Sequence, residues 1–66
     1  MIVTVNGEQR DFDEGTNLVG LIESFGLNPK ATAVQYNEDI IAREELSSST
    51  LQDGDVVELI RIVGGG

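Results

Sequence analysis

The chain has 66 residues and a formal net charge of -8, from twelve acidic and four basic side chains. A chain this short can build one domain with a modest core, because it buries only about 60% of the surface that its unfolded form exposes. It contains no cysteine and no histidine, which excludes disulfides, thiol nucleophiles and metal sites built on thiolate or imidazole. The negative charge repels nucleic-acid phosphates and anionic membranes, so the expected partner is a protein with a basic surface.

The apolar runs of the chain are short. None approaches the roughly 18 residues that a membrane span requires, and no basic-then-apolar leader opens the sequence. We therefore expect a cytoplasmic protein that does not bind membranes and that is monomeric on its own.

A hairpin is the first predicted element. Residues 1–5 alternate β-branched side chains and precede Asn6-Gly7, a dipeptide typical of tight hairpin turns. Residues 9–13 would form the return strand. Because Phe12 is its single large apolar side chain, we expect this strand at an edge of a sheet or half exposed.

A helix follows the hairpin. Thr16 is its predicted N-cap. Apolar side chains recur at i, i+3, i+4 and i+7, the spacing of one helix face: Leu18, Leu21, Ile22 and Phe25. Gly26 is placed to end the helix in the left-handed conformation.

The second half of the chain predicts three more strands. The three strands are predicted at 31–36, 40–42 (a short one) and 56–63. A turn at 37–39 joins the first two strands. A polar loop at 43–50, anchored by Leu46, and a turn at 53–55 lead to the last strand. One helix covering one face of a mixed sheet is an α+β plan of two layers. We expect a domain at 1–63 and a flexible glycine tail at 64–66.

Three glycines close the sequence directly after the last predicted strand. Without Cβ atoms, Gly64 and Gly65 could thread a narrow channel of a partner and deliver the carboxylate of Gly66. Attack of that carboxylate on the α-phosphate of ATP would give an acyl-adenylate, from which a sulfur nucleophile could displace AMP and leave a thiocarboxylate. The alternative is a frayed or appended end; if Gly66 were appended, Gly65 would be the reactive residue.

Short motifs in a fixed order give the chain a family resemblance. They are the segments 2–7, 14–16, 41–44 and 53–55, together with Asn37 and the terminal glycines. The sequence resembles the ThiS-like sulfur carriers of thiamin biosynthesis over nearly its whole length. Its length also favours this family over the related small subunit of molybdopterin synthase.

The resemblance implies a ubiquitin-like β-grasp fold of about five strands packed on one α-helix, and a carrier that is not an enzyme. It implies no permanently bound cofactor. An E1-like (ThiF-like) enzyme would use ATP to adenylate Gly66, a sulfur donor such as a cysteine desulfurase would supply sulfur, and a ThiG-like thiazole synthase would receive it. Two alternatives stay open: a carrier for molybdopterin or another thiolation pathway, and a ubiquitin-like module that binds a partner non-covalently.

The last predicted strand also offers a docking surface. Glu58, Ile60 and Ile62 share one face. By analogy with ubiquitin-like proteins, the two isoleucines would dock the activating enzyme; the alternative is that neighbouring strands or loops cover them.

Acidic side chains have two readings. Five of them could steer the carrier towards a basic enzyme surface, or could be a solvated face with turn chemistry: Asp11, Asp13, Glu14, Asp53 and Asp55. We expect no metal site, because Asp11-Phe12-Asp13 lacks the remaining ligands of a calcium loop.

Overall fold

The computed structural model describes residues 1–62. Its strands are β1 (Ile2–Val5), β2 (Glu8–Asp11), β3 (Thr32–Tyr36), β4 (Asp39–Ile41) and β5 (Val56–Arg61). One α-helix, α1 (Leu18–Ser24), and two 3₁₀ turns, η1 (Pro29–Ala31) and η2 (Arg43–Glu45), complete the described elements. The predicted domain boundary at 63 and the predicted tail at 64–66 lie outside the described residues.

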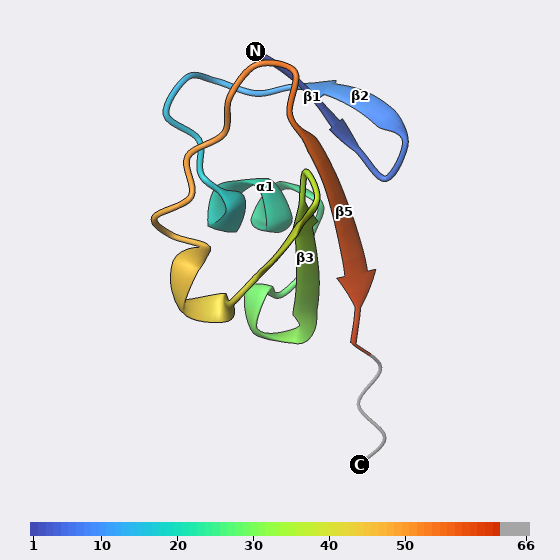
Figure 1. The fold of residues 1–66 in the computed structure, drawn as a ribbon, viewed down its shortest axis with the longest axis vertical. Coiled ribbons are helices and arrows are strands. Elements are labelled where there is room, and N and C mark those ends of the chain that lie inside the picture. Colours follow the sequence, from blue (N-terminus) through green and yellow to red (C-terminus); the bar gives the residue numbers. More distant parts are fainter. Residues whose placement is uncertain (63–66) are drawn as a thin grey trace.

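The five strands form one mixed sheet in the order β2-β1-β5-β3-β4. β5 runs parallel to β1 and antiparallel to β3, while β1 with β2 and β3 with β4 are antiparallel hairpins. Figure 1 shows α1 packed on one side of this sheet. The α+β class and the β-grasp fold are therefore confirmed. β5 is the central strand, and β2 lies at an edge as predicted.

The core lies between α1 and the inner face of the sheet. Alternation along the strands directs one side chain in two towards the helix, and the buried apolar residues are Val3, Val5, Leu18, Leu21, Ile22, Val34, Leu46, Leu51, Val57 and Leu59. Leu46, the predicted anchor of the polar loop, retains only 2% of its exposure. Within residues 1–62, no helix is long and apolar enough to cross a membrane.

The helix begins one residue later than predicted. Asn17 is the N-cap: its side-chain oxygen accepts the Gly20 N–H at 2.9 Å, and its side-chain nitrogen donates to the Ser47 carbonyl at 3.0 Å. Thr16 instead donates its hydroxyl to the Asp13 carbonyl at 2.7 Å. The prediction of Thr16 as the N-cap was wrong. The Asn17 carboxamide caps the helix and binds a second segment at the same time, whereas the Thr16 hydroxyl does neither.

Some strand bounds also differ from the prediction. β2 begins and ends earlier, at 8–11, and β4 is shifted by one residue to 39–41. β3 starts at Thr32 because Pro29 opens the turn η1, whose Asn28 cap accepts the Lys30 N–H at 2.9 Å. Gly26, with φ of +73°, follows the helix end as predicted.

Candidate functional site

Strand β5 carries the chain towards its last residues from the centre of the sheet. Its register pairs Val57 with both Val5 of β1 and Tyr36 of β3. After the strand ends at Arg61, the Ile62 N–H still donates to the Ala31 carbonyl at 2.9 Å. Figure 1 shows β5 leaving the domain at the end remote from the N-terminus. The predicted reactive residue Gly66 and the threading residues Gly64 and Gly65 lie outside the described residues.

Two asparagines at turn tips hold β5 through their side chains. Asn6 and Asn37 both have positive φ, at 51° and 56°. The Asn6 side-chain oxygen accepts the Leu59 N–H at 2.7 Å, and that of Asn37 accepts the Val56 N–H at 2.9 Å. Both residues were predicted as turn formers, because asparagine tolerates the left-handed conformation. Their bonds to β5 were missed, since they join segments distant in the chain.

The outer face of β5 is not covered by the helix. Ile60 is 53% exposed and Ile62 is 55% exposed, so neighbouring strands and loops do not cover them. Glu58 is also exposed on this face, opposite Gln35 in the register of β3. Alternating burial along β5 agrees with the predicted sharing of one face by Glu58 and Ile60; the strand ends at Arg61 and does not continue through Ile62 as predicted. Docking to an enzyme at these residues stays a prediction.

Asp55 does not belong to a solvated acidic face. It is 9% exposed and accepts hydrogen bonds from the Tyr36 hydroxyl and from the Gln52 N–H, the latter at 2.7 Å. Burial, followed by this bond to Asp55, raises the pKa of Tyr36 to about 12. Asp55 therefore joins β3 to the start of β5 and is not one of the free acidic residues that could steer the protein towards a basic surface.

Two other members of the acidic set bind the N-terminus. The Asp11 carboxylate pairs with the Met1 ammonium at 3.1 Å, and this hydrogen bond raises the pKa of the amine. The Asp53 carboxylate accepts the Ile2 N–H at 2.6 Å. Asp13 and Glu14 are exposed. These contacts favour the turn-chemistry reading for Asp11 and Asp53.

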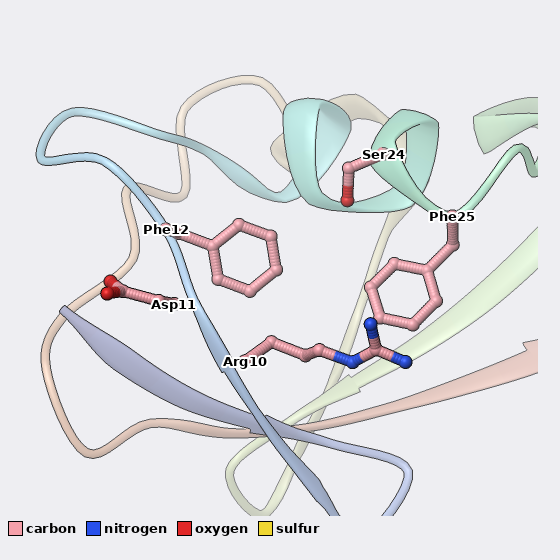
Figure 2. Close-up of a pocket in the computed structure, with 5 residues that line it drawn as sticks. All are labelled: Arg10, Asp11, Phe12, Ser24 and Phe25. Atoms are coloured by element: carbon pink, nitrogen blue, oxygen red, sulfur yellow. The ribbon is translucent and has the colours of Figure 1, made fainter.

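A cleft of about 500 Å³ separates β2 from the end of α1. Figure 2 shows Phe12 and Phe25 on its walls, with the Arg10 guanidinium beside the Phe25 ring, 5.2 Å from its centroid. Asp11 points away from the cleft in the same view, and the Ser24 hydroxyl donates to the Leu21 carbonyl at 2.6 Å. The polar groups of the cleft are thus engaged in local contacts.

The acidic side chains of the described residues do not gather into a metal site. Within residues 1–62, no three acidic side chains are grouped closely enough to hold a metal ion. The only ion pair between side chains there joins Arg10 and Glu8 at 3.6 Å, on the exposed edge strand β2.

Comparisons with known proteins agree with this architecture. The family model described as the ThiS family matches residues 3–66. The sulfur carrier protein ThiS of Thermus thermophilus is 38% identical over 65 residues, which cover 98% of this chain and 100% of that protein. The crystal structure of the thiamine biosynthesis protein ThiS from Geobacter metallireducens superposes with a TM-score of 0.82, at 32% identity and with 100% of both chains covered.

Longer relatives contain a similar segment. A protein of Magnetococcus marinus named thiazole synthase is 33% identical over 66 residues. This chain spans only 20% of the length of that protein, and the same share of a second curated thiazole synthase. The family model covers nearly the whole chain, and the fold and the full-length relatives agree with it: the chain belongs to the ThiS family.

Proposed function

We propose that this protein is a sulfur carrier of thiamin biosynthesis, acting in the cytoplasm as a protein co-substrate and not as an enzyme. Membership of the ThiS family supports the role, as do full-length relatives named sulfur carrier proteins. The structural observation that supports this proposal best is the course of β5. This central strand brings the chain to the surface at Ile62, four residues before Gly66. Exposed apolar side chains lie beside that exit.

The proposed chemistry takes place on the carboxylate of Gly66. An E1-like, ThiF-like enzyme catalyses attack of this carboxylate on the α-phosphate of ATP, which forms the acyl-adenylate and releases pyrophosphate. The terminal sulfur of a persulfide on a donor such as a cysteine desulfurase then attacks the acyl carbon. A carbon–sulfur bond forms, the bond to AMP breaks, and AMP leaves with the electron pair. A thiol then attacks the donor sulfur of the resulting acyl disulfide, which breaks the sulfur–sulfur bond, leaves the thiocarboxylate on the carrier and joins the thiol to the donor in a disulfide. ATP is bound by the partner, so the carrier needs no resident cofactor.

Glycines suit this chemistry because they limit the width of the segment that enters a partner. Four residues in extended conformation span at most about 14 Å, so the reacting carbon can lie that far from Ile62. Gly64 and Gly65 are the proposed threading residues, since a Cβ at either position would widen the segment. The folded domain then stays at the channel mouth, where Ile60, Ile62 and Glu58 are the proposed docking residues.

Thiazole synthase is the proposed acceptor. Two longer relatives named thiazole synthase contain a segment similar to this chain. Fusion of two activities in one chain commonly joins proteins that act together when they are separate. This observation favours a ThiG-like acceptor over a molybdopterin or other thiolation pathway.

The first test is the intact mass of the protein after incubation with the adenylating enzyme of its own organism, ATP and a sulfur donor. We expect a mass gain equal to exchanging one oxygen for one sulfur. Deletion of Gly65 and Gly66 is the control: it should abolish the gain while circular dichroism stays unchanged. No gain, with an enzyme shown to activate another carrier, would favour a module that binds partners non-covalently.

A further inference from the structure

A hollow of about 300 Å³ lies beneath the end of β5, on the side opposite to the Ile60 side chain, and Ile62 lies at its edge. It is bounded by the connection from α1 to β3 (residues 26–32) and by residues 61–62. Arg61, the last residue of β5, stands opposite Thr32 in the register. Alternation places its side chain on the same side as buried Leu59. The core ends there, and Arg61 is exposed.

Main-chain contacts already occupy most polar groups around the hollow. The Asn28 carbonyl accepts the Thr32 hydroxyl at 2.8 Å, and the Ala31 carbonyl accepts the Ile62 N–H at 2.9 Å. Arg61 differs: within residues 1–62 it forms neither an ion pair nor a side-chain hydrogen bond. A guanidinium has five donors and no acceptor, so its remaining capacity is for an anion supplied from outside the domain.

Opposed contacts would solve a geometric problem of glycine tails. A segment without side chains can slide into a channel, but nothing on it defines how the domain is rotated about the axis of the tail. An apolar contact at Ile60 fixes one side of that axis. A second contact on the other side, at Arg61, would fix the rotation.

We propose that Arg61 forms an ion pair with an aspartate or glutamate at the mouth of the channel in the adenylating enzyme. The inference rests on the proposed function. Gly66 is the fifth residue after Arg61, so a tail extended in a channel puts about 17 Å between them; the guanidinium then remains outside the reaction centre, and Arg61 is a positioning residue. A carboxylate is the expected partner because its two oxygens match the guanidinium fork in a bidentate, charge-assisted pair. The contact would also reject carriers with an acidic side chain at this position.

The test is carrier-dependent ATP–pyrophosphate exchange by the adenylating enzyme of the same organism, with carrier concentration varied. We expect Arg61→Gln to raise KM about tenfold, the equivalent of one charge pair at an interface, with kcat unchanged. Arg61→Lys should restore most of the affinity, and Arg61→Glu should weaken it further. Arg43→Gln is the matched control, because Arg43 is an exposed arginine in η2, outside the hollow.

Salt provides a second readout. KM of the natural carrier should rise with ionic strength more steeply than KM of Arg61→Gln. Only the natural carrier forms the ion pair with the enzyme, and salt weakens that pair by screening it. Equal KM for Arg61→Gln and Arg43→Gln would overturn the inference, as would a lower kcat at unchanged KM. Absence of exchange with the natural carrier would reject the proposed function itself, and the inference with it.

Discussion

Asp55 illustrates how one residue can change role with its surroundings. It is one of twelve acidic residues in a chain of charge -8, yet it is nearly buried and accepts hydrogen bonds from two other segments. Its carboxylate faces the hydroxyl of Tyr36, the only tyrosine of the chain. The phenol therefore stays protonated over a wider pH range than in the unfolded chain.

Titration of Tyr36 tests this contact. Its pKa rises from an ordinary value of 10.0 to about 12. Because the folded protein holds this proton more tightly, the resulting stability is fully present below pH 10 and is lost as pH rises through about 12. We expect phenolate absorbance to appear near pH 12 in the folded protein and near pH 10 in urea, with circular dichroism recorded in parallel.

Asp55→Asn supplies the control for this titration. It removes the charged acceptor but retains burial, which is the larger cause of the shift, so the midpoint should move only part of the way towards the unfolded value. If Tyr36 has the same pKa in the folded protein as in the unfolded chain, the contact between Tyr36 and Asp55 is contradicted.

At the scale of elements, the outer face of β5 is the surface whose function can be separated from stability. Ile60→Ser removes an apolar side chain that is 53% exposed, so the free energy of unfolding should change by less than about 1 kcal/mol. Binding to the adenylating enzyme should weaken by about tenfold or more, as at an interface hot spot.

Ile2→Ser is the matched control for Ile60→Ser. Ile2 is 41% exposed on β1 and precedes Thr4, which stands opposite Val56 at the start of β5, so Ile2 lies far from the end of that strand. Carrier-dependent pyrophosphate exchange should be unchanged by this substitution. Equal losses in the two variants would show that the enzyme does not dock at the end of β5.

Sequence patterns predicted these elements where local chemistry decides them. The turns at Asn6-Gly7 and Asp53-Gly54-Asp55 were predictable because few residues adopt the backbone conformations required. The apolar face of α1 followed from its spacing. The N-cap was missed because the choice between Thr16 and Asn17 depends on the Ser47 carbonyl, thirty residues away in the chain.

The candidate site was predictable only in part, for the same reason. Alternation placed Ile60 and Ile62 on one face, but their exposure depends on which face of the sheet α1 covers. Asp55 could not be separated from the solvated acids, because its partner Tyr36 lies nineteen residues away. The bond from Asn6 to Leu59 spans fifty-three residues, and no local pattern encodes it.

At the scale of the whole molecule, the net negative charge affects stability. The net charge of -8 makes the acidic residues repel one another more in the folded domain than in the expanded chain. Raising sodium chloride from about 0.01 M to about 0.15 M shortens the screening length from about 30 Å to about 8 Å. The unfolding midpoint should therefore rise, as measured by circular dichroism melting; a midpoint that falls would show that attractive pairs dominate instead.

The placement of β5 also has a mechanical consequence. β1 and β3 both bond along it, and the Asn6 and Asn37 side chains add bonds to Leu59 and Val56. Tension applied along the axis of β5 is thus shared by the hydrogen bonds on both of its edges. It loads all of these bonds in shear at the same time. An edge strand pulled sideways would instead break its bonds one after another. In the proposed function, a partner enzyme that pulls on the end of this chain would therefore leave the domain folded.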